Sequence, residues 1–233
     1  MRNNNLRVYK SNTLIEASYK LSTNEQRIIL SCIARLDSRK PLPSGNKFCI
    51  TADEFAADFD LKMHTAYEAL KDASDKLYER DIKMYDEKGR TNERVRWVYN
   101  IEYQPGEGKI SLGFSPTIAP YLTKLHRQFT SYQLKRVANL RSSHAIRIFE
   151  MLQQYSDTGF LKISLEDFKD RLALGDQYQR FYDIQRRIIK PAIKELKNKS
   201  SLIIECKTKK KGRAVVGLEF TFEDDDQIPL DLN

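Results

Sequence analysis

The stretch ITADEF at residues 50–55 returns as ISLEDF at residues 163–168, so the same pattern occurs at two places 113 residues apart. In both copies an isoleucine is followed by a hydroxyl residue, Thr51 or Ser164, whose side chain can cap a helix. Acidic residues suited to the first turn of a helix come next, and a phenylalanine closes each copy. The stretch therefore predicts a strand followed by a capped helix, present twice in one chain.

A second correspondence lies upstream of the first. Arg27 and Arg147 occupy matching places in two amphipathic patterns, 120 residues apart. The two spacings differ by seven residues, and the difference falls at the PLPSGN stretch of residues 41–46. This composition is typical of a loop, where changes in length are tolerated. The repeat therefore includes a preceding helix as well as the strand and the capped helix.

Hydrophobic periodicity and capping residues extend each copy in the same order: helix, strand, two further helices and a β-ribbon. In the first copy we expect a helix from Ser22, a strand at 48–50, helices from Thr51 and over 65–78, and strands at 82–85, 95–103 and 109–114. In the second we expect a helix after Ser142, a strand at 160–163, helices from Ser164 and over 178–197, and strands at 202–207 and 214–222.

This order is that of a winged helix-turn-helix module, in which the last helix enters the major groove and the hairpin "wing" touches the backbone. The fold class is accordingly α+β, with two tandem winged-helix domains, and a length of 233 residues suits two domains. We place the domains at residues 1–125 and 126–233. Modules that bind only each other or another protein fit the same order, and that alternative stays open.

Composition points to a polyanionic partner. The formal net charge is +8, which favours nucleic acid first and an anionic membrane surface second. No apolar run approaches the roughly 20 residues of a bilayer span. The polar start MRNNN lacks the apolar core of a secretory signal, so we expect a cytoplasmic protein.

The sequence lacks the motifs expected for redox-active cysteine pairs, for metal binding and for catalysis. Cys32, Cys49 and Cys206 form no C-x-x-C pair, and we expect buried, reduced thiols. The three histidines are scattered, and the acidic run at 223–226 cannot converge on one ion, so we expect no metal and no cofactor. A Walker loop and the His-x-His pair of a nicking enzyme are both missing, which argues against catalysis.

The positive charge is concentrated in residues 180–213, where twelve Lys and Arg stand against three acidic residues. Such a focused charge suits phosphate binding, because each neutralised phosphate releases counterions. A solvated charged face and a solubilising turn are the alternatives. Helical spacing places the first group of cations on one stripe, opposite an apolar side, with Arg186 beside it: Arg180, Arg187, Lys190, Lys194 and Lys197. The second group falls in the expected hairpin turn: Lys207, Lys209, Lys210, Lys211 and Arg213.

Two further features qualify this surface. Pro191 lacks the N–H that would bond to residue 187, so we expect the helix to bend or break there, with its base-reading part before the proline. In the first module the third helix mixes acidic and basic residues, which weakens it as a DNA reader. Its expected wing still carries Arg90, Arg94 and Arg96, which we expect to touch the DNA backbone.

Two stretches resemble a known family. Residues 178–196, YQRFYDIQRRIIKPAIKEL, and residues 139–150, NLRSSHAIRIFE, are similar to signatures of the iteron-binding Rep initiators of theta-replicating bacterial plasmids. The resemblance implies two winged-helix domains related by pseudo-two-fold symmetry that bind directly repeated origin sites. It also implies that the second module makes the main contacts, with 207–213 as its wing. Carried over by position, the recognition-helix residues are Arg180, Asp183, Arg186, Arg187 and Lys190.

The functional expectation follows from charge, spacing and resemblance together. We expect a replication initiator, not an enzyme, that binds iterons in duplex DNA, promotes origin opening and recruits the host replication initiator and replicative helicase by contact. The resemblance implies a homodimer, formed through the first module, that represses its own promoter, with the monomer as the initiating form. A winged-helix transcriptional regulator without a role in initiation is the alternative.

Overall fold

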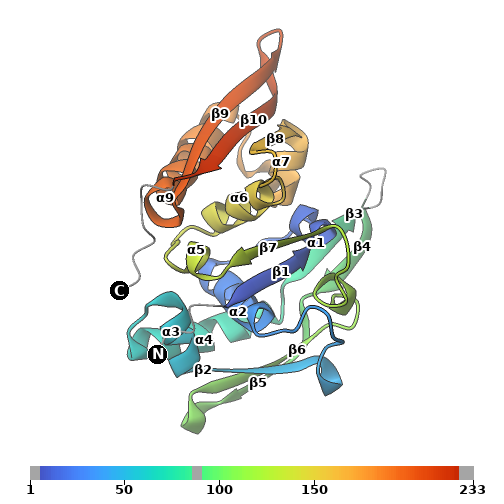
Figure 1. Cartoon of the computed structure of the whole chain (residues 1–233), viewed down its shortest axis with the longest axis vertical. Coiled ribbons are helices and arrows are strands. Elements are labelled where there is room, and N and C mark those ends of the chain that lie inside the picture. Colours follow the sequence, from blue (N-terminus) through green and yellow to red (C-terminus); the bar gives the residue numbers. More distant parts are fainter. Residues whose placement is uncertain (1–5, 86–90, 226–233) are drawn as a thin grey trace. The chain divides into compact units, whose positions relative to one another are not determined.

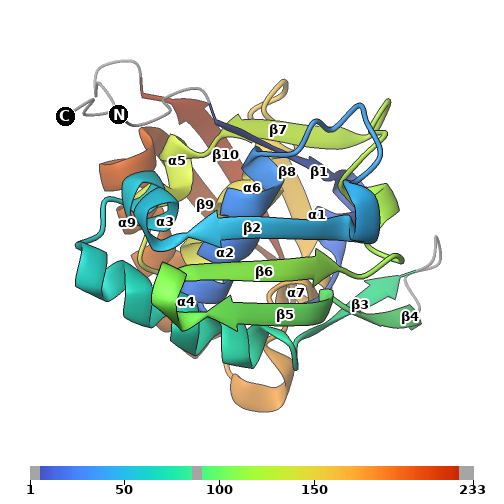
Figure 2. The ribbon, with the colours of Figure 1, turned by 90° about the horizontal axis from the view of Figure 1, so that it is seen from below.

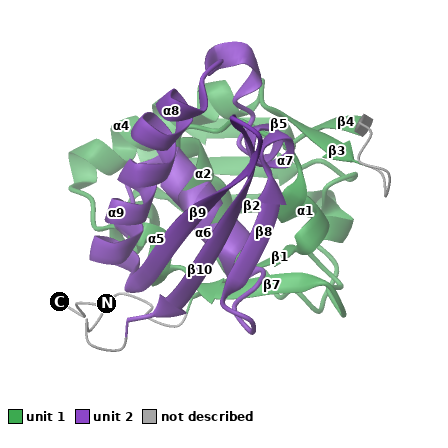
Figure 3. Cartoon of the chain, turned by 90° about the horizontal axis from the view of Figure 1, so that it is seen from above, with its two compact units in different colours: residues 1–138 green, residues 139–233 purple. Residues whose placement is uncertain are grey.

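A computed structural model describes residues 6–85 and 91–225 of the chain. The chain divides into two compact units, 1–138 and 139–233, which Figure 3 distinguishes by colour. The division lies beyond the boundary that we placed after residue 125. The strand β7 (Phe129–Gln133) explains the difference, because it pairs antiparallel with β1 (Arg7–Ser11) and so belongs to the first unit. A sequence pattern does not reveal a pairing between strands more than a hundred residues apart.

Figure 1 labels the elements of the first unit, which follows the expected order with additions at both ends. Its helices are α1 (Asn12–Glu16), α2 (Thr23–Ala34), α3 (Ala52–Phe59), α4 (Met63–Leu77) and α5 (Lys135–Ala138). Besides β1 and β7, its strands are β2 (Lys47–Thr51), β3 (Asp81–Tyr85), β4 (Thr91–Arg96), β5 (Val98–Gln104) and β6 (Lys109–Phe114).

Local capping fixes where these helices begin. At the start of α2 the Ser22 hydroxyl accepts the Glu25 N–H at 3.3 Å, and the Glu25 carboxylate accepts the Ser22 N–H at 2.6 Å. Thr51 and Glu54 exchange the same pair of bonds at the start of α3. Each reciprocal bond satisfies a donor that a helix start would otherwise leave without a partner. Both expected helix starts are therefore confirmed.

The first unit contains two separate hairpins, β3–β4 and β5–β6, where the sequence pattern predicted one continuous strand over 95–103. Strands β2, β6 and β5 form one sheet in that order, visible side by side in Figure 2, and β3 pairs with β4 in another. The single strand that we expected over 95–103 is wrong, because the fully buried Trp97 ends β4 and β5 then starts at Val98. Trp97 packs edge-on against Tyr19 with ring centroids 5.0 Å apart. Its burial turns the chain from one hairpin into the other.

The second unit repeats the central part of the first. Its elements are α6 (Ser143–Gln153), β8 (Phe160–Ser164), α7 (Leu165–Arg171), α8 (Phe181–Ile184), a π-helical turn (Gln185–Ile189), α9 (Lys190–Ser200), β9 (Leu202–Lys211) and β10 (Ala214–Asp224). Its sheet order, β8-β10-β9, matches β2-β6-β5, so β9 and β10 form the wing and β5 and β6 are their counterparts. Ser164 caps α7 by accepting the Asp167 N–H at 3.0 Å. Each unit is thus a winged helix.

Of the bend or break that we expected at Pro191, a break does not occur. Residues 181–200 stay helical throughout, and the turn just before the proline is π-helical, with the Lys190 N–H bonded to the Gln185 carbonyl. A π turn is wider than an α turn, and such turns occur where the regular ladder of hydrogen bonds is interrupted. The proline therefore alters the winding beside Arg186 and Arg187 without ending the helix.

The three cysteines differ in their exposure to solvent. Cys32 is buried, and burial raises the pKa of its thiol to about 12. Cys206 is half-buried, but Cys49 is exposed, so the expectation of three buried thiols is wrong for Cys49.

Within residues 6–85 and 91–225, no helix combines the length and the apolar character that crossing a membrane requires.

Candidate nucleic-acid interface

The helix over residues 181–200 has the two-sided character that its sequence predicts. One side is buried in the second unit through Ile184, Ile188, Ile189, Ala192 and Leu196. The other side carries the exposed cations Arg180, Arg186, Arg187, Lys190, Lys194 and Lys197. Burying the apolar residues anchors the helix by the hydrophobic effect, so the opposite side is held outward. The predicted division of this helix into a packed side and a basic side is confirmed.

Asp183 lies between two arginines at the start of this helix. Its Oδ1 atom is 3.8 Å from an Nη atom of Arg186 and 3.8 Å from Nε of Arg187. The two guanidinium side chains are more than half exposed, whereas Asp183 is one-third exposed. Two cations thus share one carboxylate oxygen in a setting open to water, where each pair is weak. The Asp183 carboxylate by itself therefore holds neither arginine firmly.

Arg186 has a second neighbour that the sequence reasoning missed. Its guanidinium carbon lies 5.6 Å from the centre of the Tyr182 ring, within the range of a cation–π contact. Tyr182 is 64% exposed and lies on the same basic side of the helix. The four-residue spacing between the two residues is the signal that could have found this contact.

Glu195 was also missed, and it acts inside the unit. Its carboxylate accepts the N–H groups of Arg141 at 2.7 Å and Ser142 at 3.2 Å, and a hydrogen bond from Lys199 at 2.7 Å. Burial alone would raise the pKa of Glu195, but the bonds from Lys199 and the Arg141 N–H outweigh it and lower that pKa. The carboxylate of α9 thus joins α9 to the start of α6 and is not turned toward the basic stripe.

The wing differs from the sequence expectation in one respect. Lys207, Lys209, Lys210 and Lys211 lie on β9 itself, and the hairpin turn consists of Gly212 and Arg213, with Lys211 opposite Ala214. A strand advances about 3.3 Å per residue, so the lysines extend over about 13 Å of its length. The wing lysines are therefore distributed along one strand of a long hairpin and are not confined to its turn.

Two of the wing lysines have acidic neighbours. Lys207 lies 3.4 Å from Glu205, and Lys209 lies 3.3 Å from Glu219 on the adjacent strand. Among the described residues, no ion pair is found for Lys210, Lys211 or Arg213. Since exposed pairs of this kind are weak, the end of the hairpin keeps most of its positive charge.

The first unit places its arginines away from its wing. Arg94 and Arg96 lie on β4, which pairs with β3, whereas the counterpart of the β9–β10 wing is β5–β6. The expectation that these two arginines belong to that wing is wrong, because Trp97 separates the hairpins. Arg90 lies outside the described residues. The β5–β6 hairpin has no excess of positive charge: Glu102 pairs with Lys47 of the neighbouring strand β2 at 2.8 Å, and Glu107 pairs with Lys109 at 3.7 Å.

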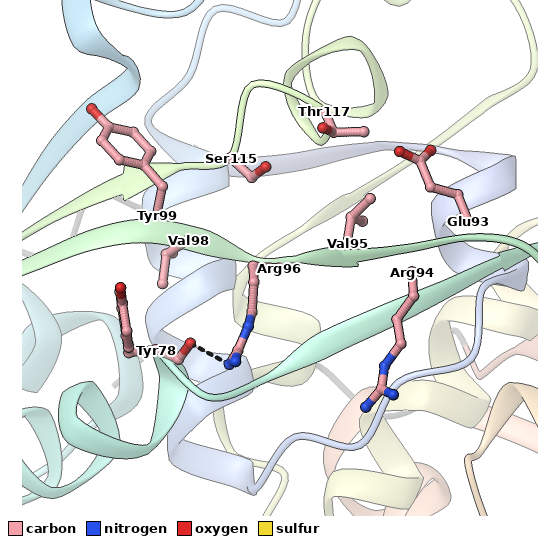
Figure 4. A pocket seen from close by; sticks show the side chains of 9 residues that line it. All are labelled: Tyr78, Glu93, Arg94, Val95, Arg96, Val98, Tyr99, Ser115 and Thr117. Atoms are coloured by element: carbon pink, nitrogen blue, oxygen red, sulfur yellow. Dashed lines mark hydrogen bonds between the residues drawn. The ribbon is translucent and has the colours of Figure 1, made fainter.

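Figure 4 shows Arg94 and Arg96 pointing to one side of β4, and Glu93 and Val95 to the other. Arg94 forms an ion pair with Asp81, and Arg96 bonds to the Tyr78 carbonyl at 2.8 Å and to Glu79 at 3.0 Å. The groove that these residues line is open and has a volume of about 450 Å³. In the described part of the chain, no group of His, Cys, Asp and Glu side chains could hold a metal ion.

Comparisons with known proteins agree with this architecture. Residues 7–153 match the family described as "Initiator Replication protein, WH1", and residues 164–222 match "Initiator Rep protein, WH2". The first match extends through α6, which by its contacts belongs to the second unit. Together the two matches confirm the fold class and the resemblance drawn from residues 139–150 and 178–196.

Individual relatives cover nearly the whole chain. A "Replication initiation protein" of Escherichia coli is 28% identical over 230 residues, which are 96% of this chain and 71% of that protein. The "PI protein" of Escherichia coli is 24% identical over 98% of this chain and 87% of its own length. The crystal structure of Pi initiator protein in complex with iteron DNA superposes with a TM-score of 0.82 at 24% identity, covering 97% of this chain and all of that one. The chain therefore belongs to the family of plasmid replication initiator proteins built from two winged-helix modules.

Proposed function

We propose that this protein binds directly repeated sequences, or iterons, in duplex DNA at a plasmid origin and starts replication there. The observation that carries the proposal is the exposed basic side of the helix over 181–200, held outward by a buried apolar side. The fold shared with Pi initiator protein, whose structure contains iteron DNA, supports the same conclusion. The proposal needs no catalytic group, because origin opening and recruitment proceed through binding.

The contacts divide by chemistry. Arg180, just before the helix, and Arg186, Arg187 and Lys190 on its first half are assigned to base edges in the major groove, where Arg and Lys suit guanine. Asp183 is assigned to the same surface, since it orients the two arginines beside it. Backbone phosphates are assigned to the remaining cations of this unit: Lys194, Lys207, Lys209, Lys210, Lys211 and Arg213.

The first unit is assigned an auxiliary role on DNA and a role in self-association. Arg94 and Arg96 are assigned to phosphates from the β3–β4 hairpin rather than from the wing, and Arg90 is assigned to phosphates as well. Among the described residues β5 is one of the two edge strands of its sheet, with β2 at the other side, and an open edge can accept a strand from a second copy. A homodimer of this kind would repress the protein's own promoter, and the monomer would initiate, recruiting the host replication initiator and the replicative helicase in the cytoplasm.

Footprinting with the full-length protein on the DNA that flanks its gene tests the binding step. We expect protection of direct repeats, with a periodic pattern along the duplex. A plasmid carrying the gene and those repeats should then replicate in a suitable host. Replication failure despite protein expression and intact footprints would favour the alternative, a winged-helix transcriptional regulator. Random binding without protected repeats would overturn the proposal.

A further inference from the structure

Tyr182 stands out among the apolar side chains that the structure describes. At 64% exposure it is the most exposed of the large hydrophobic residues, and the next, Met63 and Tyr78, reach 48%. It lies in the first turn of α8, two residues after Arg180, which occupies the position just before the helix. This is the end of the helix that the proposed function turns toward base edges. A single exposed aromatic side chain is ordinary on a protein surface, so a functional role for Tyr182 depends on the side chains that it contacts.

Arg186 is the neighbour that matters. Its guanidinium lies over the Tyr182 ring at 5.6 Å and beside the Asp183 carboxylate at 3.8 Å. A ring on one side and a carboxylate beside it both favour this position of the guanidinium. Arg187 shares the carboxylate but forms no ring contact among those found for the described residues. Of the two arginines, Arg186 therefore has the larger set of contacts that order it before DNA arrives.

The orientation of the Arg186 guanidinium determines whether it can recognise a base. Arginine recognises guanine through two parallel hydrogen bonds to O6 and N7, which require the guanidinium to lie in the plane of the base. Ordering the side chain in advance lowers the conformational entropy lost on binding. The Tyr182 ring, at the edge of the same surface, then meets the base pair beside that guanine. In the major groove the apolar group a base offers is the 5-methyl group of thymine.

We propose that Tyr182 is a specificity-determining residue, whose ring holds Arg186 in the plane of a guanine and contacts the 5-methyl group of a neighbouring thymine. The inference rests on the proposed function, because it requires this helix to enter the major groove. Both contacts, with Arg186 and with the methyl group, are made by the aromatic ring of Tyr182 and not by its phenolic hydroxyl. Tyr182→Phe keeps the ring, and Tyr182→Ala removes it.

The probe is the duplex that the full-length protein selects from a library of random sequences. Binding to this duplex and to random DNA is measured for the unaltered protein, for both Tyr182 variants, and for Phe160→Ala. Phe160 is a matched control because it is an exposed aromatic of the same unit, on β8, at 43% exposure. We expect Tyr182→Ala to lose about tenfold in discrimination, the scale of one cation–π or apolar base contact. Tyr182→Phe and Phe160→Ala should keep the discrimination of the unaltered protein.

Replacing thymine by uracil, one position at a time, removes only the 5-methyl group. At one position next to a guanine, uracil should weaken binding by the unaltered protein and by Tyr182→Phe, while leaving Tyr182→Ala unchanged. Equal discrimination by Tyr182→Ala, a loss with Tyr182→Phe as large as with Tyr182→Ala, or a uracil effect that persists in Tyr182→Ala would each overturn the inference. If the unaltered protein selects no sequence at all, the proposed function itself fails. Thermal unfolding of each variant confirms that the protein is folded.

Discussion

Glu195 in α9 accepts the backbone N–H of Arg141, 54 residues earlier in the chain, at 2.7 Å. The same carboxylate accepts the N–H of Ser142, the residue that caps α6. One side chain of the helix that carries the basic side therefore holds the start of the first helix of its unit. The acidic residue nearest the middle of the basic stripe serves the fold and leaves the stripe positive.

Glu195→Ala should lower the free energy of unfolding by about 1–3 kcal/mol, because two backbone donors and Lys199 lose their acceptor. Glu195→Gln, which keeps one accepting oxygen, should lose less. Chemical denaturation measures both. Stability unchanged in Glu195→Ala would show that water replaces the carboxylate without cost.

The lowered pKa of Glu195 predicts how stability depends on pH. Because the folded state favours the ionised carboxylate, this stabilisation is present above the unfolded pKa of about 4.3 and is lost as pH falls through the lower folded pKa. The difference in unfolding free energy between the unaltered protein and Glu195→Gln should therefore shrink on acidification below about pH 4. A difference that stayed constant from pH 7 to pH 3 would contradict this assignment.

Arg187→Ala should reduce the discrimination between specific and random DNA, since it removes a base contact, by roughly 1–3 kcal/mol. Fluorescence anisotropy with the two duplexes measures the ratio. Lys162→Ala, which removes a positive charge from β8, controls for the loss of charge alone. An unchanged affinity and footprint in Arg187→Ala would mean that another helix reads the bases.

Lys210→Ala should act differently from Arg187→Ala. As a phosphate contact near the end of the wing, its loss should weaken binding to specific and random DNA equally and reduce the slope of log affinity against log salt by about one. A salt titration from low to physiological concentrations measures the slope. A change confined to the specific duplex would place Lys210 against a base.

Arg94→Ala tests the auxiliary contact of the first unit. If the β3–β4 hairpin touches phosphates, the variant should bind all DNA less tightly, by less than about tenfold, with a smaller salt slope. Asp81→Asn removes the carboxylate paired with Arg94 and should have the opposite effect. DNA binding identical to the unaltered protein in both variants would remove this hairpin from the interface.

Gly159 and Gly175 offer a matched pair for the stability of the second unit. Both have a positive φ, +63° and +51°, but a Cβ at Gly159 would lie 2.7 Å from the Phe222 carbonyl oxygen, whereas nothing lies within 4 Å at Gly175. Gly175→Ala should cost about 1–2 kcal/mol of backbone strain, and Gly159→Ala more, because the β10 backbone must move. Equal losses in denaturant unfolding would show that β10 yields freely at Phe222.

Features that depend on near neighbours in the chain could be predicted from the residues. Ser22, Thr51 and Ser164 cap helices through bonds to residues three positions away, and helical spacing separates Ile184 and Ile188 from Arg180 and Arg187. Such patterns repeat over one or two turns, so the residues alone specify them. The repeated unit, the winged-helix order and the basic stripe were all predicted in this way.

The pairing of the strands and the course of the helix at Pro191 depend on contacts between distant residues, and they became clear from the fold. Burial of Trp97 separates the β3–β4 hairpin from the β5–β6 wing, and the β1–β7 pair extends the first unit to residue 138. The register of β9 with β10 turns an expected loop of lysines into a strand. Pairing joins residues distant in the chain, and its free energy comes from contacts that no local pattern encodes. The basic surface was therefore predictable in composition, but its shape was not.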